Sequence, residues 1–333
     1  MKRLLSLLLA LVLCVGLTGC LSHEEQQNRK LAMELVNGSS SVEYALSTGT
    51  TLKGQRIYED NSGLIVYLAG IKGTPRAPQL VLAVKNGTRH DLSMSVANLT
   101  YNNWAADGWV DTFDFDAHSA SMTTISCDNT FALLNLADIH TLSMDLFIYT
   151  SSQYDQVANA SISLDLGNEP WVDDYQAQGI PLLDSNQVQV VAQSLRNRSD
   201  QAQISLYANN QSNRSIRIAS SNITLNDKPV EMFLWSSLSP NARRMIQENI
   251  MEEDTYNELS LAPNDELKFR LQISDDETGA VLDEVDVTLH NSDFADLPVP
   301  DTTTEPMPDP VEDTTAAAPT EDPAEEAASE PAA

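Results

Sequence analysis

The feature that most constrains the fold is an internal duplication. When the chain is shifted by 124 positions, residues 64–103 align with residues 188–227 without a gap. The clearest match joins Asn98-Leu99-Thr100-Tyr101-Asn102 to Asn222-Ile223-Thr224-Leu225-Asn226. After a small further shift the match resumes, and Ile162–Leu166 meets Val285–Leu289. Two units of about 100 residues have the size of domains and are far longer than the repeat of a solenoid.

The matched segments alternate apolar and polar residues, as in Leu64, Val66 and Leu68 of the first unit. This period of two is typical of a strand with one buried face. Polar turns such as Asn86-Gly87-Thr88 separate the segments. Several short strands in about 100 residues, with no long helix, predict a sandwich of two sheets. The predicted fold class is therefore all-β, with two tandem sandwiches that each bury a core of their own.

One segment allows two interpretations. Residues 239–248 begin with Ser239-Pro240, which suits the capped start of a helix. Their counterpart in the first unit, His118 to Cys127, is rich in Ser, Thr and Ile and favours a strand. Because the fold usually overrides local propensity, we expect a strand.

Two runs in the first unit resemble a known kind of domain. Residues 84–102 read V-K-N-G-T-x-x-D-L-x-M-x-V-x-x-L-x-Y-N, and residues 136–149 read L-A-D-I-x-x-L-x-M-x-L-x-I-Y. These runs resemble the immunoglobulin-like domains of Firmicutes lipoproteins, which are largely uncharacterised and often occur in tandem. The second unit departs from the pattern at Asn210-Gln211 and over residues 236–262. The resemblance implies immunoglobulin-like sandwiches and brings no catalytic residues.

The start of the chain predicts export. Lys2 and Arg3 precede an apolar run too short to span a membrane comfortably, which suits the core of a secretion signal. The run ends in Leu17-Thr18-Gly19-Cys20, which resembles the lipobox of bacterial lipoproteins. The resemblance implies cleavage before Cys20, a lipid on Cys20, and a place on the extracytoplasmic face of the cell membrane. The alternatives are an ordinary secretory signal with an incidental cysteine, or a retained membrane helix.

The expected organisation follows from these patterns. Trp171, Ile180, Leu182 and Leu183 make the segment between the units too apolar for a free linker, so we expect part of it to pack. After Phe294 the chain is rich in Pro and acid and poor in large apolar residues, which predicts disorder. The expected parts are a signal peptide at 1–19, a tether with a short helix at 20–62, sandwiches at 63–167 and 187–290, a linker at 168–186, and a disordered tail at 295–333.

Charge excludes some partners. The formal net charge is −29, whereas proteins that bind nucleic acid need a basic surface. The same acidity argues against direct adhesion to anionic lipid headgroups. With Cys14 in the signal and Cys20 lipidated, only Cys127 remains, so no internal disulfide is expected. A lone cysteine in a β-branched stretch is more often a small core residue than a reactive thiol.

The search for chemistry leaves one candidate site. Tyr101, Trp104 and Trp109 lie beside a predicted turn and form a ligand platform if they are exposed, or core packing if they are not. Asp111, Asp114 and Asp116 alternate with phenylalanines, which favours a strand with its acidic face in water over a calcium site. The histidines and the rest of the chain match no metal, phosphate or nucleophile motif, so we expect no metal, no cofactor and no enzyme.

These observations favour a non-enzymatic interaction module. The expected partners are the membrane, through the lipid on Cys20, and an unknown protein, peptide or glycan. The alternative is a structural or accessory lipoprotein of the envelope without a soluble ligand. A hydrolase with an unrecognised site is a third class.

Overall fold

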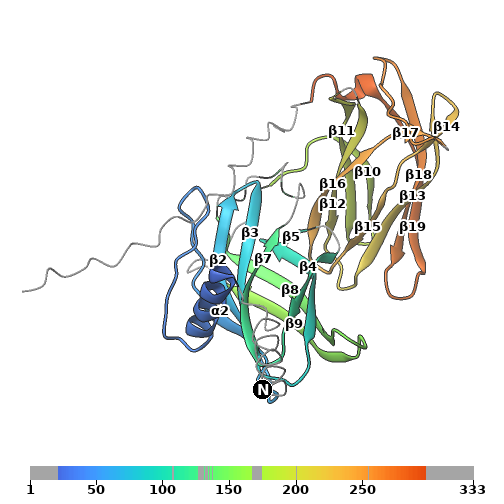
Figure 1. The fold of residues 1–333 in the computed structure, drawn as a ribbon. Coiled ribbons are helices and arrows are strands. Elements are labelled where there is room, and N and C mark those ends of the chain that lie inside the picture. Colours follow the sequence, from blue (N-terminus) through green and yellow to red (C-terminus); the bar gives the residue numbers. More distant parts are fainter. Residues whose placement is uncertain are drawn as a thin grey trace, which may run out of the picture. The chain divides into compact units, whose positions relative to one another are not determined.

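The chain folds into two β-sandwiches, one from each repeat (Figure 1). The structure is a computed structural model, and it describes residues 22–106, 109–126, 131, 134, 136, 138–166, 175–199, 201–253 and 255–297. Residues 109–111 are described for their backbone only. The fold is all-β, as predicted, with a helix at the start of the described chain.

The first sandwich packs two antiparallel sheets face to face. One sheet has the order β1-β2-β3-β7, and the other joins β9, β8 and β4, with β5 and β6 pairing along β4. Alternate residues of β2, β3, β4 and β8 meet between the sheets, which buries the core predicted from the period of two. The elements are α2 (His23–Val36), β1 (Gln55–Glu59), β2 (Ile65–Thr74), β3 (Ala77–Asn86), β4 (Leu92–Tyr101), β5 (Trp104–Ala105), β6 (Trp109–Phe115), β7 (Ser119–Ser126), β8 (Thr141–Thr150) and β9 (Gln156–Asp165).

The second sandwich repeats this arrangement. One sheet has the order β10-β11-β12-β16, and the other has the order β17-β14-β13-β18-β19, with β15 also pairing with β13. Its core is a separate cluster, built chiefly from β11, β12, β13 and β18. The elements are β10 (Ile180–Ser185), β11 (Val188–Arg198), β12 (Gln201–Asn210), β13 (Ile216–Leu225), β14 (Lys228–Glu231), β15 (Trp235–Leu238), β16 (Arg243–Asn249), β17 (Met251–Glu252), β18 (Glu266–Asp275), β19 (Val281–His290) and the 3-10 helix η1 (Asn291–Phe294).

The duplication is confirmed strand by strand. β3 and β12 begin and end at positions that differ by 124, and so do β4 and β13. Both members of the second pair carry the same bulge, where the register with the neighbouring strand shifts between Ala97 and Thr100 and between Ser221 and Thr224. Asn98 and Asn222 sit in these bulges with φ of 51° and 55°, a left-handed conformation that asparagine tolerates better than most residues.

A buried asparagine closes the same corner of each sandwich. Asn86 and Asn210 are fully buried, and each side-chain amide donates to three backbone carbonyls at 2.9 to 3.2 Å. Each Oδ1 accepts from the backbone and hydroxyl of a residue two positions later. The sequence difference after these asparagines, Gly87 against Gln211, therefore leaves the network intact. The partners are His90, Phe115, Asp116 and Thr88 for Asn86, and Arg214, Leu238, Ser239 and Ser212 for Asn210.

The segment that allowed two interpretations is a strand, as expected. β16 occupies Arg243–Asn249 and pairs with β12 over its whole length. Its counterpart β7 pairs with β3 in the same place. The pairing partner, which lies far away in the sequence, decides the structure against the local signs of a helix.

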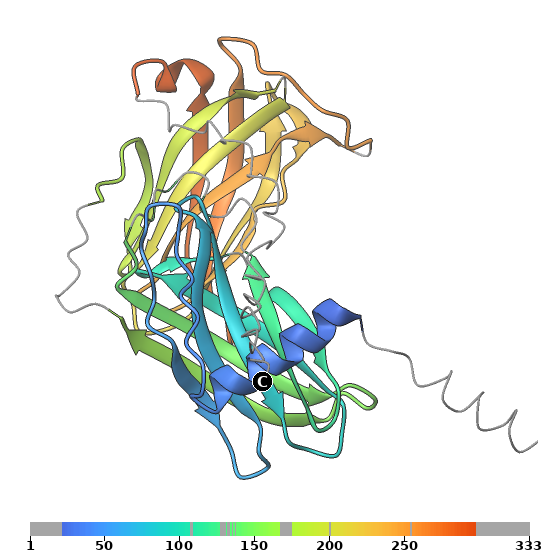
Figure 2. The same ribbon diagram turned by 60° about the vertical axis from the view of Figure 1, so that its left-hand side comes forward.

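The segment predicted as a tether at 20–62 contains the expected short helix, but its described part packs on the first sandwich. α2 starts from an N-cap at Ser22, whose hydroxyl accepts from the backbone N–H of Glu25 at 3.1 Å. Its buried residues Ala32, Leu35 and Val36 pack on the outer face of β2, β3 and β7 (Figure 2). Further on, β1 pairs with β2. This segment belongs to the first sandwich because its thin apolar stripe finds an apolar outer sheet face to cover.

Two further boundaries shift. The predicted linker at 168–186 contains β10, which pairs with β11 and belongs to the second sandwich, whereas residues 167–174, with Trp171, lie outside the described residues. The predicted tail at 295–333 lies outside them from 298 onward. Before that point η1 buries Phe294, and Leu297 packs against the second core. The second sandwich therefore extends on both sides of 187–290.

Candidate functional site

The aromatic platform predicted from Tyr101, Trp104 and Trp109 is not present at the two of these residues whose side chains are described. Tyr101 is 0% exposed and meets Phe131 edge-on, with 5.4 Å between ring centroids. Trp104 is 4% exposed. The side chain of Trp109 lies outside the described residues, and its backbone pairs with Ala97. Tyr101 therefore packs in the core, which is the alternative to an exposed platform.

Trp104 serves the contact between the two repeats. Its ring meets Tyr175 and Tyr207 edge-on, at 5.0 and 5.9 Å, and the guanidinium of Arg243 lies 4.0 Å from the ring centroid. Strand β5 also pairs with β16 at Trp104 and Arg243, which joins sheets of the two repeats. Burial lowers the pKa of Arg243 to about 10, because the charged form loses hydration. This cluster is structural, since Trp104 and Tyr207 are buried in it and Tyr175 is half-buried.

The other residues weighed as sites do not come together. Cys20 and Cys127 lie outside the described residues. Asp114 accepts a hydrogen bond from Ser93 at 2.6 Å, and Asp116 pairs with Arg29 at 2.6 Å. The described part of the chain contains no cluster of three or more potential metal ligands. Nor does it contain a helix with the length and hydrophobicity needed to cross a membrane.

A groove opens in the second sandwich where the chain returns beside β13. β15 pairs with β13 from Ile216 to Ala219, and β14 pairs with Thr224 and Leu225. Between these two ladders the backbone N–H of Ser220 donates to Leu234 O at 3.2 Å. Within the described chain, residues 221–223 have no ladder partner on the side of β13 that faces β14 and β15. The space between the parted segments has a volume of about 650 Å³.

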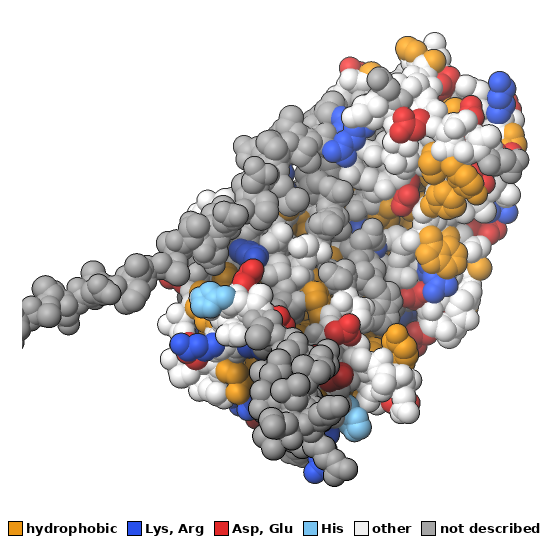
Figure 3. All heavy atoms as spheres, viewed as in Figure 1, with side chains coloured by type: hydrophobic (Ala, Val, Ile, Leu, Met, Phe, Trp, Pro, Cys, Tyr) orange, Lys and Arg blue, Asp and Glu red, His pale blue; other side chains and the backbone are white. Residues whose placement is uncertain are grey.

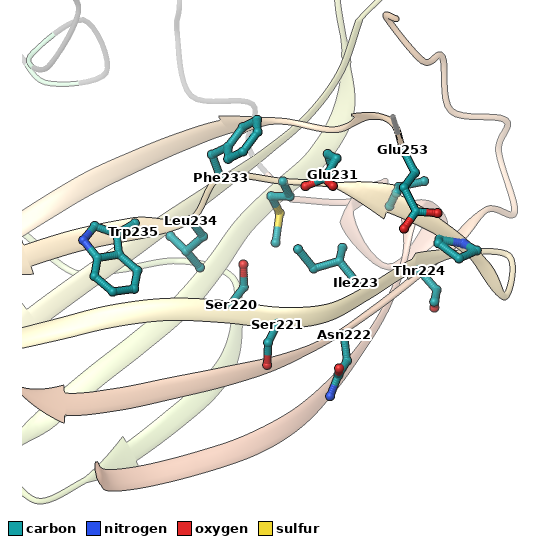
Figure 4. Close-up of a pocket in the computed structure, with 13 residues that line it drawn as sticks. Ser220, Ser221, Asn222, Ile223, Thr224, Glu231, Phe233, Leu234, Trp235 and Glu253 are labelled. Carbon is teal, nitrogen blue, oxygen red and sulfur yellow. The ribbon is translucent and has the colours of Figure 1, made fainter. Parts of the chain in front are cut away.

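The groove has a polar strand along one side and an alternating wall along the other. Figure 4 shows Ser220, Ser221 and Asn222 along β13, opposite the segment that carries Phe233, Leu234 and Trp235. Along the wall the side chains alternate, because an extended chain points successive residues to opposite faces. Met232 and Leu234 are buried in the core, whereas Phe233 is 56% and Trp235 66% exposed. The wall therefore presents aromatic rings to solvent.

A turn brings a third aromatic ring to the site. Tyr256 is 55% exposed and stacks on Phe233, with 5.9 Å between centroids and 24° between ring planes. Glu252, the last residue of β17, holds this turn through hydrogen bonds from Asn257 at 3.0 Å and Thr255 at 2.9 Å. These bonds, that from Asn257 first, lower the pKa of Glu252 because they favour its charged form.

Charge is distributed unevenly along the groove. Figure 4 places Trp235 and Phe233 toward one end and the carboxylates of Glu231 and Glu253 toward the other. None of the described lining residues is a lysine or an arginine. Beside the groove, Arg217 lies 4.7 Å from the Trp235 ring centroid and pairs with Asp276. Figure 3 shows hydrophobic side chains gathered on the surface of this sandwich.

Phe233, Trp235 and Tyr256 were not predicted as site residues, although the sequence carries a signal for Phe233 and Trp235. Met232-Phe233-Leu234-Trp235 is an uninterrupted apolar run in a segment whose neighbours have a period of two. A strand with one buried face buries only alternate residues, so one pair of such a run must face water.

Comparisons with known proteins place the chain in no family. No family model matches it, and no curated protein matches it. Exo-chitosanase CsxA of Amycolatopsis orientalis is 14% identical over 71% of this chain, which spans 26% of that chain, with a TM-score of 0.22. A protein of unknown function from Porphyromonas gingivalis W83 is 12% identical over 64% of this chain and 91% of its own, with a TM-score of 0.19. At such TM-scores these likenesses carry no argument about function.

Proposed function

We propose that this chain is a non-enzymatic binding lipoprotein, anchored through Cys20 at the extracytoplasmic face of the cell membrane. We also propose that its sandwiches belong to the immunoglobulin-like domains of Firmicutes lipoproteins. Its partner, a protein, peptide or glycan, binds in the groove of the second sandwich. The observation that carries the proposal is the pair of rings at Phe233 and Trp235, which stay more than half exposed beside an open groove.

Exposed aromatic residues of this kind favour binding. Burying such a ring removes a large apolar area from water and stabilises a complex, whereas leaving it exposed contributes nothing to the fold. Aromatic residues are enriched among the residues that dominate binding energy at interfaces. A binding role also agrees with the scattered histidines and with the absence of any catalytic motif in the sequence.

The position of α2 supports a short connection to the membrane. Only Leu21 separates Cys20 from Ser22, which caps the helix that packs on the first sandwich. Two residue steps span at most about 7 Å. A lipid on Cys20 therefore holds the first sandwich next to the bilayer and leaves no long tether between them.

Anchoring is tested by Cys20→Ala. The variant is expected to leave the membrane fraction or remain unprocessed, and to incorporate no labelled fatty acid. Wild-type protein measured in the same cells is the control. A variant that still partitions with membranes and carries the label contradicts the lipid anchor.

Binding is tested by photo-crosslinking in intact cells. A benzophenone amino acid placed at position 235 is expected to give a defined adduct, and the Phe233→Ser substitution is expected to remove it. The matched control carries the same probe at Val157, an exposed apolar residue of β9. Identical adducts at both positions, or none at 235, contradict the groove as the binding site and favour a structural role.

A further inference from the structure

The groove exposes strand backbone on one side. Residues 221–223 of β13 lie between the ladders to β15 and β14, without a described ladder partner on the groove side, and include the bulge at Asn222. Unpaired strand backbone is the surface to which an extended peptide adds by main-chain hydrogen bonds. A volume of about 650 Å³ accommodates several side chains of such a peptide.

Apolar side chains line the middle of the groove. Ile223 is half-buried on β13, and Met232 and Leu234 lie buried on the opposite side. Figure 4 shows Ile223 pointing between the two parted segments. In an extended peptide every second side chain points to the same face. A peptide along β13 therefore directs alternate side chains at Ile223, Met232 and Leu234.

Charge complementarity sets the other side chains. Glu231 and Glu253 line the groove, and none of its described lining residues is basic. A lysine or arginine of the ligand donates charge-assisted hydrogen bonds to these carboxylates. The net charge of −29 also attracts a basic partner over a longer distance.

The rings suit a peptide better than a sugar. A sugar stacks on an open ring face, but Phe233 already stacks on Tyr256, and Arg217 lies over Trp235. One face of each ring is thus in use within the protein. The remaining faces and edges suffice for an aliphatic side chain or stem, which needs apolar contact and no flat platform.

We propose that the groove binds an extended peptide segment in which apolar residues alternate with basic ones. The segment lies along residues 221–223, its apolar side chains contact Ile223 and the aromatic wall, and its basic side chains reach Glu231 and Glu253. This inference rests on the groove being the binding site proposed above, and it adds the chemical class of the ligand.

The test uses three fluorescein-labelled peptides of equal length, in which Val alternates with Lys, with Gln or with Glu. Fluorescence anisotropy is measured with the full mature chain in detergent micelles. The Lys peptide is expected to bind at least about tenfold more tightly than the Gln peptide, and its binding is expected to weaken as salt is raised. Equal binding of the Lys and Glu peptides overturns the proposal.

Two matched pairs of substitutions locate the contacts. Glu231→Gln with Glu253→Gln is expected to weaken the Lys peptide by about tenfold or more and to leave the Gln peptide unchanged. The control, Glu43→Gln with Glu277→Gln, changes the net charge equally at exposed residues outside the groove lining. An equal loss in both pairs shows that only net charge acts, and it overturns the proposal.

A glycan array and the crosslinking at position 235 distinguish a failure of the peptide proposal from a failure of the proposed binding function. If glycans bind in the groove and the peptides do not, the ligand class is wrong while the binding function stands. If the peptides and the glycans fail and the crosslink at position 235 is also absent, the proposed function fails with it. A crosslink that persists without peptide binding overturns only the basic peptide.

Discussion

The hairpins that return beside β4 and β13 hold equivalent places in the two sandwiches, and they close differently. In the first sandwich the returning chain pairs with β4 up to Val96 and Ala97, and again at Thr100 and Tyr101. In the second, Ser220 and Ser221 stand where Val96 and Ala97 would be, and the ladder already ends at Ala219. Two lost pairs turn a closed hairpin into a groove.

The aromatic residues follow the same division. Trp104 of the closed hairpin is covered by Arg243, Tyr175 and Tyr207, so it serves the contact between the repeats. Trp235 of the open hairpin remains 66% exposed. The same duplicated frame thus buries the tryptophan of one copy by packing and leaves the tryptophan of the other exposed. The frame itself, with its buried asparagines and bulges, stays the same in both.

The largest expected difference between the two copies is in stability. Trp104→Ala is expected to lower the free energy of unfolding by about 3–5 kcal/mol, because it leaves a cavity among packed rings. Trp235→Ala is expected to change it by less than about 0.5 kcal/mol, since that ring is exposed. Urea unfolding followed by circular dichroism measures both. Similar losses in the two variants would contradict the division into a packed and an exposed tryptophan.

The shared frame is tested at the buried asparagines. Asn86→Ala and Asn210→Ala are each expected to lower the free energy of unfolding by about 3 kcal/mol, because each strands buried backbone carbonyls without a donor. The exposed Asn213→Ala, expected to stay within about 0.5 kcal/mol of wild type, is the control. A large loss in one sandwich with none in the other would show that the two corners are not equivalent.

The shared bulge has a smaller effect. Asn98→Ala and Asn222→Ala are each expected to cost about 1–2 kcal/mol, because alanine tolerates their left-handed conformation poorly. Asn222→Gly is expected to recover most of this loss, because glycine tolerates the left-handed conformation. Asn98→Gly is expected to recover less, because the Asn98 amide also donates to Asp145 at 2.6 Å. Thermal unfolding of the four variants measures these costs. Alanine variants as stable as the glycine variants would contradict the strained bulge.

Much of this frame was predictable from the sequence. The period of two, the turn residues and the offset of 124 located most of the strands, because each is a local pattern or a repeat of one. The exposed platform at Trp104 was wrong because its cover, Arg243, comes from the other repeat, which no local pattern reveals. The groove was missed for a similar reason, since its opening depends on where a long-range ladder stops at Ala219.

The boundaries failed at elements with weak patterns of their own. α2 has only a thin apolar stripe, so its sequence suggested a helix but not that it covers the outer face of a sheet. β10 carries Pro181 and is short, which makes it resemble a linker until it is paired with β11. In both cases tertiary packing supplies the stability that the local sequence lacks.

The smallest expected effect is a pH dependence of the exposed stack of Tyr256 on Phe233 that the buried pair of Tyr101 and Phe131 does not share. The pKa of Glu252 is lowered by hydrogen bonds from Asn257 and Thr255, so its contribution to the turn is fully present above its unfolded-state pKa. That contribution is lost as the pH falls through the lower folded-state pKa. Acidification is therefore expected to loosen the stack of Tyr256 on Phe233, seen as a change in the NMR shifts of both rings.

The buried edge-on pair of Tyr101 and Phe131 is the internal control, and the shifts of both rings are expected to stay constant over the same pH range because both lie in the core. Glu252→Gln keeps an oxygen that accepts both hydrogen bonds but cannot be protonated in this range. The variant is therefore expected to hold the Tyr256 shifts constant through acidification. If the NMR shifts of Tyr256 still change with pH in the variant, another group causes the effect. Glu252 then does not hold Tyr256 against Phe233.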